Sequence, residues 1–397
     1  VMTDTIPQPP LSTIASMPTD DTLKRLLTLS AHEDITSFAV GLPSPDGFPV
    51  EAVAEAAQEV LKSMGRRALQ YSVTEGEPEL REAVAAFETS RGTPTRPEEV
   101  QIVTGSQQAL DLVARAFLDP GDRVLVENPS YLGALSAFKL CRPRFEFLAA
   151  DDKGLDPASF TEDYRGAKFA YIMPTFNNPT GLTISLDRRH ELVKKARELD
   201  LWVIEDDPYG ELWYEKRPPQ TIRSLMPERT VRLGTLSKVL SPGMRLGYIV
   251  GDPKLMEIIA DLKMSADMHT PTMTQLIAAR LLSSGFIEEH LPRVRKIYRE
   301  RGTCMLECLA KYMPRDSGIS WTNVEGGMFI WVTLPEHIDT VEMMKEAIAA
   351  KVSYVPGVAC FALADHHNHM RMSFVTVPEE KIDEGVRRLA EIIRRHL

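Results

Sequence analysis

The sequence is poor in cysteine, with only Cys141, Cys304, Cys308 and Cys360 among 397 residues. Cys304 and Cys308 are four residues apart within a predicted helix, where helix packing accounts for them. The chain contains no CxxC pair and no set of spacings typical of a disulfide framework. This pattern argues against a small secreted fold and a cysteine metal site, and it favours a reducing, cytoplasmic compartment.

Long hydrophobic runs and a surplus of basic residues are also missing. No stretch approaches the about 20 uninterrupted apolar residues of a membrane-spanning helix, and the first residues lack the basic and apolar regions of a signal peptide. The net charge of −10 provides no electrostatic footprint for nucleic acid or an anionic membrane. We therefore expect neither as a partner, and any bound anion must be captured by a local site.

What is present is the composition of a globular protein, 43% hydrophobic and 26% charged, with a length that suggests two domains. Between about residues 50 and 285, short β-rich runs alternate with helical patterns such as 106–117 and 186–199. This alternation predicts an α/β domain with a mostly parallel, seven-stranded sheet flanked by helices. The strand candidates are 100–105, 122–128, 144–149, 168–174, 201–207, 230–236 and 245–251.

The pattern changes after about residue 285. A long helical stretch, 288–313, is followed by β-rich runs and two more helical segments, which predicts a smaller α+β domain. In "HMRMSF", residues 369–374, the two-residue alternation places Arg371 on the face opposite Met370, Met372 and Phe374. We expect an N-terminal arm at 1–30, with an amphipathic stretch at 22–31. A small α+β domain would comprise 31–50 and 290–397, and a large domain 51–289.

Polar loops follow several predicted strands. In "TGSQQAL", Gly105 precedes Ser106 and Gln107 at a helix start, which indicates an anion site or, taken alone, an ordinary serine cap. Tyr131 in "ENPSYLGA" can pack on the sheet or stack on a planar ligand. The loop "PTFNNPTG" is dense in hydrogen-bonding groups around Asn178.

Acidic and histidine clusters invite a metal interpretation. Glu205, Asp206 and Asp207 follow the strand at 201–207, but no HxxE or DxD partner pattern lies near them. The cluster "DHHNH", residues 365–369, falls in a predicted loop and is interpreted as solvated. We expect no metal site.

Lys238 stands in a distinctive neighbourhood. Thr235 and Ser237 precede it and Arg245 follows it, so the segment can hold a dianion beside an amine. A desolvated lysine beside cationic groups has a lowered pKa and becomes a nucleophile toward an aldehyde. A phosphate pocket, such an amine, a carboxylate for a ring nitrogen and donors for a phenolate together indicate pyridoxal 5′-phosphate (PLP).

The order of the motifs resembles that of fold-type I PLP-dependent aminotransferases, in particular the 2-aminoadipate and kynurenine aminotransferase subgroup. The resemblance runs from about residue 36 to the C-terminus. It rests on "YSVTEGEPELR", "TGSQQAL", "NPSY", "NNPTG", "EDDPYGEL", "TLSKVLSPGMRLGY", "EGGMFIWV" and "MRMSF". It implies the aspartate aminotransferase-like fold, with a large PLP-binding domain and a smaller α+β domain.

The resemblance also implies a role for each matched residue. Lys238 would form the internal aldimine and later move a proton between Cα and C4′. Asp206 would pair with the ring nitrogen, Asn178 and Tyr209 would donate to the phenolic oxygen, and Tyr131 would stack on the ring. The residues expected to hold the phosphate are Ser106, Gln107, Thr235, Ser237 and Arg245.

Further matches concern the substrate and the assembly. Arg371 would clamp the substrate carboxylate, with Asn178 and Gly41 beside it. Tyr71 would reach the phosphate of a neighbouring subunit, which implies a homodimer with shared active sites. The usual Gly-Gly-Leu-Pro reads Val40-Gly41-Leu42-Pro43 here, and an arginine that some relatives place near the substrate side chain corresponds to Thr22. A preference for an acidic, aromatic or aliphatic side chain is therefore left open.

The predicted activity is transfer of an amino group from an L-amino acid to a 2-oxo acid, 2-oxoglutarate or pyruvate, by a ping-pong mechanism. The alternative is a PLP-dependent C–S β-lyase or other Cα chemistry, because the motifs indicate the cofactor and not which Cα bond breaks. A transcriptional regulator with this domain behind a winged helix is disfavoured, because only some 35 residues precede the first motif and the chain is acidic.

Overall fold

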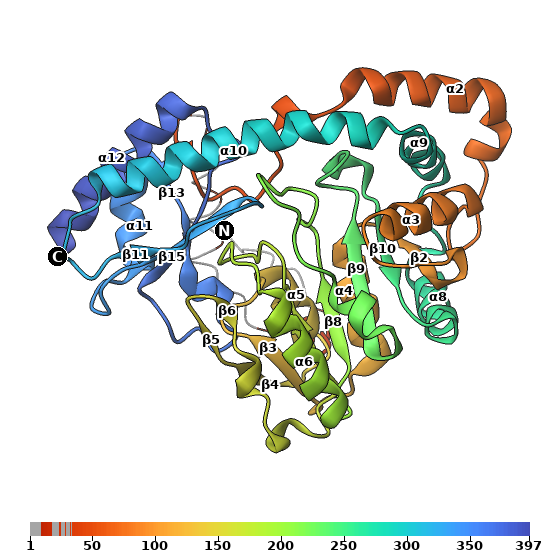
Figure 1. Ribbon diagram of the computed structural model, residues 1–397, viewed down its shortest axis with the longest axis horizontal. Helices are drawn as coiled ribbons and strands as arrows, with labels where there is room; N and C mark the ends of the chain where they lie inside the picture. Colours follow the sequence, from red (N-terminus) through yellow and green to blue (C-terminus); the bar gives the residue numbers. More distant parts are fainter. Residues whose placement is uncertain (1–8, 18–23, 25–27, 29–31, 33) are drawn as a thin grey trace, which may run out of the picture.

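The computed structural model describes residues 9–17, 24, 28, 32 and 34–397, and its centre is a seven-stranded sheet (Figure 1). The strand order is β2-β10-β9-β8-β7-β3-β4, and all neighbours are parallel except β10, which is antiparallel to both β2 and β9. The seven predicted strands and the mostly parallel arrangement are thus confirmed. The bounds are β2 Val100–Val103, β3 Arg123–Glu127, β4 Arg144–Leu148, β7 Phe169–Ile172, β8 Val203–Asp206, β9 Thr230–Thr235 and β10 Gly247–Val250.

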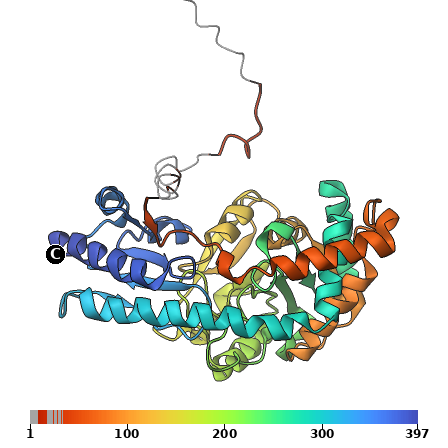
Figure 2. The same cartoon turned by 90° about the horizontal axis from the view of Figure 1, so that it is seen from above.

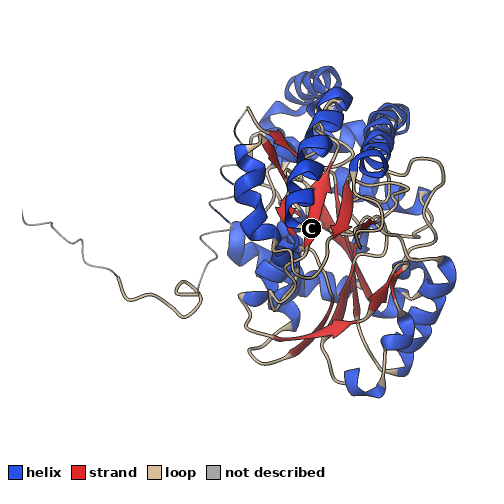
Figure 3. Cartoon of the chain, turned by 90° about the vertical axis from the view of Figure 1, so that its left-hand side faces the viewer, coloured by secondary structure: helices blue, strands red, loops and turns tan. Residues whose placement is uncertain are grey.

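Helices cover both faces of this sheet, and Figure 3 shows the strands between them. One apolar cluster joins α4 and α5 to the sheet through Leu110, Val113 and Phe138, and another joins α6 through Leu192 and Val193. The predicted helices at 106–117 and 186–199 are confirmed as α4 and α6. The bounds are α2 Val50–Ala68, α3 Pro78–Ser90, α4 Ser106–Phe117, α5 Leu132–Lys139, α6 Leu186–Glu198, α7 Ile222–Leu225, α8 Pro253–Asp267 and α9 Thr272–Ser283.

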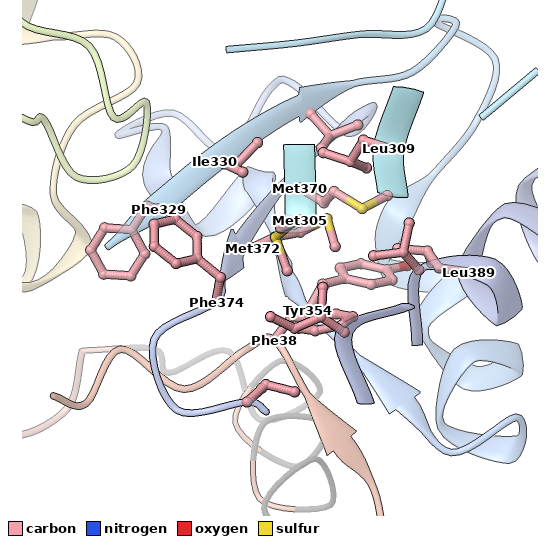
Figure 4. Packing of buried hydrophobic residues seen from close by; sticks show 14 of the residues in the cluster. Phe38, Met305, Leu309, Phe329, Ile330, Tyr354, Met370, Met372, Phe374 and Leu389 are labelled. Carbon is pink, nitrogen blue, oxygen red and sulfur yellow. The ribbon is translucent and has the colours of Figure 1, made fainter. Parts of the chain in front are cut away.

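A second, four-stranded antiparallel sheet has the order β11-β12-β15-β14. Its apolar face packs on helices in a core that contains Met305, Leu309 and Met372 (Figure 4). The helix α10 runs from the vicinity of α9 to the side of α12 and so joins the two parts (Figures 1 and 2). The bounds are β11 Ser320–Trp321, β12 Phe329–Thr333, β14 Val355–Pro356, β15 His369–Ser373, α10 Phe286–Tyr312, α11 Thr340–Ala349 and α12 Glu379–His396.

The second core also draws in the beginning of the described chain. Strand β1, Thr36–Ser37, pairs in parallel with β13, Val352–Ser353, and Phe38 is buried in the same cluster as Phe374 (Figure 4). A short hairpin, β5 Ala150–Asp151 and β6 Gly154–Leu155, projects after β4. Residues from both ends of the sequence therefore build one core.

The expected N-terminal arm falls mostly on residues that the structure does not describe. Its amphipathic stretch at 22–31, apart from Lys24 and Thr28, lies outside the described residues. The domain boundaries at 30, 50 and 290 remain predictions. Within the described residues, no helix has the length and apolar content needed to cross a membrane.

Candidate active site

The polar loops predicted from the sequence converge at the carboxyl edge of the large sheet. Parallel strands end at the same edge, so β3, β7 and β8 deliver Tyr131, Asn178 and Asp206 to one region. Strand β9 runs in the same direction and delivers Lys238 there as well. The edge faces the second sheet, which contributes Arg371 from β15.

Asp206 is the last residue of β8 and is only 2% exposed. The hydroxyl of Tyr171 donates to its Oδ2 at 2.6 Å, whereas its Oδ1 is buried and has no hydrogen-bond partner. Burial raises the pKa of Asp206 to about 7. An unpaired buried carboxylate oxygen is costly, so this atom marks the place of a missing donor.

Lys238 lies in the turn between β9 and β10, with its Nζ 5.8 Å from the centre of the Tyr209 ring. Burial, reinforced by the charges of Arg371 and Arg245, lowers the pKa of this lysine to about 8. Near neutral pH, the deprotonated amine is therefore a much larger fraction of Lys238 than of a solvated lysine.

A hydrogen-bonded series leads from Tyr209 to the second sheet. The Asn178 Nδ2 donates to the Tyr209 hydroxyl at 3.4 Å, and the Arg371 Nη1 donates to Asn178 Oδ1 at 3.0 Å. The Arg371 Nη2 donates to the Ala39 carbonyl at 3.1 Å, and the guanidinium lies 4.4 Å from the centre of the Phe329 ring. Arg371 is buried with its Nε unpartnered, which leaves donor capacity for an anion.

Gly41 lies against this guanidinium. A Cβ built on Gly41 would come within 3.3 Å of Arg371 Nη2 and 3.6 Å of the Phe329 ring. The structure thus brings Gly41, Asn178 and Arg371 together, and their binding of a carboxylate remains a prediction.

The start of α4 forms a cradle with Arg245. The helix is capped by Gly105, which has φ +79 and makes no side-chain cap, and Ser106 and Gln107 are its first residues. The alternative interpretation of Ser106 as the cap is therefore wrong. A Cβ on Gly105 would lie 2.2 Å from Arg245 Nη2, so the guanidinium stands directly over unpaired helix N–H groups, an arrangement suited to an anion.

Thr235 and Ser237 lie beside this cradle and are both buried. The Ser237 amide donates to Thr235 Oγ1 at 3.1 Å, and Gly247 brings β10 close to the Ser106 amide. Gln107 is exposed, and its Nε2 donates to the Gly133 carbonyl at 2.9 Å. Its amide nitrogen belongs to the helix start, whereas its side chain points to another loop.

Tyr131 caps α5 and is half-buried, with its ring over Gly133. Burial, together with the nearby charge of Asp206, raises the pKa of its phenol. The stacking of this ring on a cofactor remains a prediction.

Tyr71 is not brought into this group. It is 77% exposed, and its ring meets the edge of His269 at a centroid distance of 5.8 Å. Leu69 and Val73, two residues before and after Tyr71, are also exposed.

The acidic neighbours of Asp206 face a buried arginine. Asp207 Oδ2 lies 3.1 Å from Arg232 Nη2, and Glu205 Oε2 lies 3.6 Å from Arg232 Nη1. The segment 365–369 was predicted as a loop, but His369 begins β15; His366 stacks on Phe361 and His369 stacks on Trp331. Both clusters thus have protein partners of their own.

Three contributions escaped the sequence analysis: the Tyr171 hydroxyl, the Ala39 carbonyl and the Phe329 ring. Tyr171 reads as one more apolar member of a buried strand, and a backbone carbonyl has no signature in a sequence. Phe329 lies in the "GGMFIWV" motif. Trp331 is opposite Arg371 in the pairing of β12 with β15, and Phe329, two residues earlier, lies on the same face of β12. The two-residue alternation of this strand was therefore the available signal.

The site fits PLP on two independent observations. Asp206 Oδ1 is an acceptor without a donor, and the cradle of Gly105 and Arg245 is one that a Cβ would fill. The family model of class I and II aminotransferases matches residues 33–389. The chain belongs to this family.

Named relatives agree with the assignment. This aminotransferase is 42% identical to aromatic-amino-acid aminotransferase 1 of Thermococcus litoralis, over 94% of this chain and 92% of the relative. The kynurenine aminotransferase of Pyrococcus horikoshii, solved with PMP, shares 41% identity at a TM-score of 0.93, covering 98% of this chain and 97% of that one. The α-aminoadipate aminotransferase of Thermus thermophilus, solved with N-(5′-phosphopyridoxyl)-L-leucine, shares 40% identity at a TM-score of 0.89, covering 97% of each chain.

The protein is thus a PLP-dependent aminotransferase of fold type I. It acts on amino acids and 2-oxo acids, and the comparisons do not support the lyase alternative.

Proposed function

We propose that the converging residues hold PLP in the arrangement that the motifs predict. Lys238 Nζ is the point of covalent attachment, and Asp206 Oδ1 accepts the hydrogen bond of the protonated ring nitrogen. Tyr209 and Asn178 face the phenolic oxygen, and Tyr131 covers the ring. The phosphate is assigned to the α4 cradle and its neighbours: Ser106, Gln107, Thr235, Ser237 and Arg245. The observation that carries the proposal is the orphaned Asp206 Oδ1 at the same edge of the sheet as a lysine of lowered pKa.

The cofactor, when bound, supplies an electron sink for the negative charge that develops at the substrate Cα. The protein supplies the group that transfers the proton. Lys238 Nζ, once free, acts as the general base that removes the Cα proton, and its pKa of about 8 suits that role near neutral pH. The buried Asp206 carboxylate would stabilise a positive charge on the ring nitrogen of the bound cofactor.

Arg371 orients the substrate. Its planar guanidinium accommodates a carboxylate in a bidentate pair, and the Phe329 ring and the Ala39 carbonyl fix its plane. A carboxylate held there would keep an amino acid at the same site as Lys238, whose pKa responds to the charge of Arg371. We propose two half-reactions at this one site, with an L-amino acid as donor and 2-oxoglutarate or pyruvate as acceptor.

We also propose that the working unit is a homodimer in which Tyr71 completes the partner's phosphate site. Tyr71, Leu69 and Val73 are exposed, and so is Met268, which directly precedes the His269 that contacts Tyr71. Contiguous exposed apolar residues are typical of an interaction surface. The proposed compartment is the cytoplasm, in keeping with four unpaired cysteines.

A half-reaction screen tests the substrate. The purified PLP form is mixed with each amino acid in turn, and loss of its visible absorbance is followed together with formation of the 2-oxo acid. Productive donors convert the cofactor to its amine form, and a second addition of 2-oxoglutarate or pyruvate restores it. Release of ammonia without the amine form would contradict the proposed transfer.

A separate experiment tests the attachment point. Borohydride reduction of the wild type fixes the cofactor on a peptide that contains Lys238, and Lys238→Ala abolishes this fixation. Retention of covalent cofactor in the variant would assign the role to another lysine.

A further inference from the structure

Tyr171 is fully buried in the middle of the large sheet, on β7 beside β8. Its ring packs edge-on against Phe138 at 5.3 Å, and its hydroxyl donates to Asp206 Oδ2 at 2.6 Å. That distance is typical of an O–H···O bond to an ionised carboxylate. The two side chains therefore form a close, dry pair beneath the proposed ring position.

The two carboxylate oxygens of Asp206 differ in their hydrogen bonding. Oδ2 is occupied by the tyrosine, and Oδ1 is buried and free. A carboxylate without the tyrosine could rotate about its terminal torsion, because such sp³–sp² torsions are broad. The hydroxyl thus selects one orientation of the group.

Other charged or titratable groups face Asp206 from the surrounding elements. They are Tyr131 before α5, Asp207 and Tyr209 after β8, and Arg232 on β9. Among the described residues, Tyr171 is the one whose side chain is hydrogen-bonded to the Asp206 carboxyl group. Burial favours the neutral acid at Asp206, while the hydroxyl of Tyr171 favours the carboxylate.

We propose that Tyr171 is a positioning residue, whose hydroxyl fixes the Asp206 carboxylate so that Oδ1 faces the ring nitrogen of the cofactor. The inference rests on the proposed role of Asp206 and extends it. A phenylalanine at this position would fill the same volume and keep the contact with Phe138, so packing alone predicts no effect on the ring nitrogen.

The test measures the affinity of the apo protein for each of two ligands. One is PLP, and the other is its analogue with a C–H group in place of the ring nitrogen. Tyr171→Phe is expected to weaken PLP binding about tenfold, the value of one charge-assisted hydrogen bond, and to leave binding of the analogue unchanged. A pH titration of the bound cofactor's absorbance provides a second readout, and its midpoint is expected to move in Tyr171→Phe.

The chain offers a matched control on β10. The hydroxyl of Tyr248 also donates to a buried carboxylate, which belongs to Glu88 on α3. Tyr248→Phe is expected to change the affinities for PLP and for the analogue equally. Equal losses for the two ligands in Tyr171→Phe, or no loss for either, would overturn the proposal.

Asp206→Asn separates this inference from the proposed function. If Asp206→Asn weakens PLP relative to the analogue and Tyr171→Phe does not, only the role of Tyr171 fails. If Asp206→Asn shows no such preference, the assignment of Asp206 to the ring nitrogen fails, and the present inference fails with it.

Discussion

At the scale of single residues, the environment of Lys238 determines when its amine can react. Its pKa is lowered to about 8, first by burial and then by the charges of Arg371 and Arg245. The ammonium form predominates below that value and the nucleophilic amine above it. The rate at which apo protein takes up PLP covalently is therefore expected to rise with pH and to level off above about 8.

Stopped-flow absorbance between pH 6.5 and 9.5 measures this rate. Arg371→Met removes one of the two cations and is expected to move the midpoint to higher pH. A midpoint near the ordinary lysine value of 10.5 would contradict the burial of the amine.

Arg371 allows a second prediction at this scale. Arg371→Lys retains the charge but loses the bidentate geometry, the contact with Phe329 and the bond to Ala39. We expect kcat/KM for the amino donor to fall by about 10- to 100-fold, corresponding to about 1.5–3 kcal/mol for a charge-assisted hydrogen bond. Steady-state kinetics measure the fall, and an unchanged PLP dissociation constant serves as the internal control.

The site residues differ in how far a sequence can reveal them. Lys238, Asp206, Asn178 and Arg371 stand in loops or alternating strands, where a polar side chain in an unusual place is visible. Tyr171 is hidden because a tyrosine in a buried strand is ordinary, and its partner is 35 residues away.

At the scale of elements, the start of α4 depends on a glycine. Gly105 has φ +79 and lies under the Arg245 guanidinium. Gly105→Ala adds backbone strain of about 1–3 kcal/mol, because φ +79 with ψ 159 is a region essentially confined to glycine, and it adds a methyl group where the guanidinium now lies. We expect a loss of PLP affinity of tenfold or more, measured by titration of apo protein.

Gly121→Ala is the matched control, because Gly121 has φ +90 and open space around its Cβ position. It should lower thermal stability to a similar degree and keep PLP affinity. If the two alanine variants bind PLP equally well, the cradle does not hold the phosphate.

The end of β3 carries a buried acid that links two elements. Glu127 Oε2 accepts bonds from the Met173 amide at 2.8 Å and from Asn177 Nδ2 at 3.1 Å. Burial raises its pKa from 4.5 to about 8. Between these values the folded chain holds a proton that the unfolded chain releases, so this group makes stability fall as pH rises.

Glu127→Gln removes that proton linkage and keeps an acceptor for both donors. The stability of the variant relative to the wild type is expected to increase steadily from pH 5 to pH 8. Thermal melts at four pH values with saturating PLP measure the difference, and a difference independent of pH would be inconsistent with a buried, protonated Glu127.

The elements themselves were largely predictable from the sequence. The seven strands of the large sheet are short apolar runs bounded by turn residues, and α4 and α6 carry clear helical periodicity. Between residues 352 and 356 the chain forms two short strands, β13 and β14, because each pairs with a different partner. Such a division depends on strands far away in sequence, which no local pattern reports.

At the scale of the whole molecule, the exposed apolar side chains near Tyr71 predict assembly. Met264 and Ile258 both lie exposed on α8, at 57% and 54%. Met264 is one turn from Met268, next to the His269 that contacts Tyr71. Met264→Glu is expected to raise the dimer dissociation constant at least tenfold and to weaken PLP binding, since Tyr71 would be withdrawn from the partner.

Light scattering after size exclusion measures the assembly, with Ile258→Glu as the control. Ile258 lines a groove with Trp202 and Pro227, and Tyr71 is not among the residues that line it. A monomeric Ile258→Glu beside a dimeric Met264→Glu would place the interface on the other side of α8.

The pairing of the two chain ends has a consequence for the order in which the site is made. Residues predicted to hold PLP within one chain lie between 106 and 245, whereas Arg371 and the Ala39 carbonyl that holds it are 332 residues apart. Because the chain leaves the ribosome from its N-terminus, every cofactor ligand emerges before the strand that carries Arg371. During synthesis, the residues predicted to bind the cofactor are therefore complete before Arg371, which is predicted to bind the amino acid, has been added. The reaction becomes possible only after β15 has been synthesised.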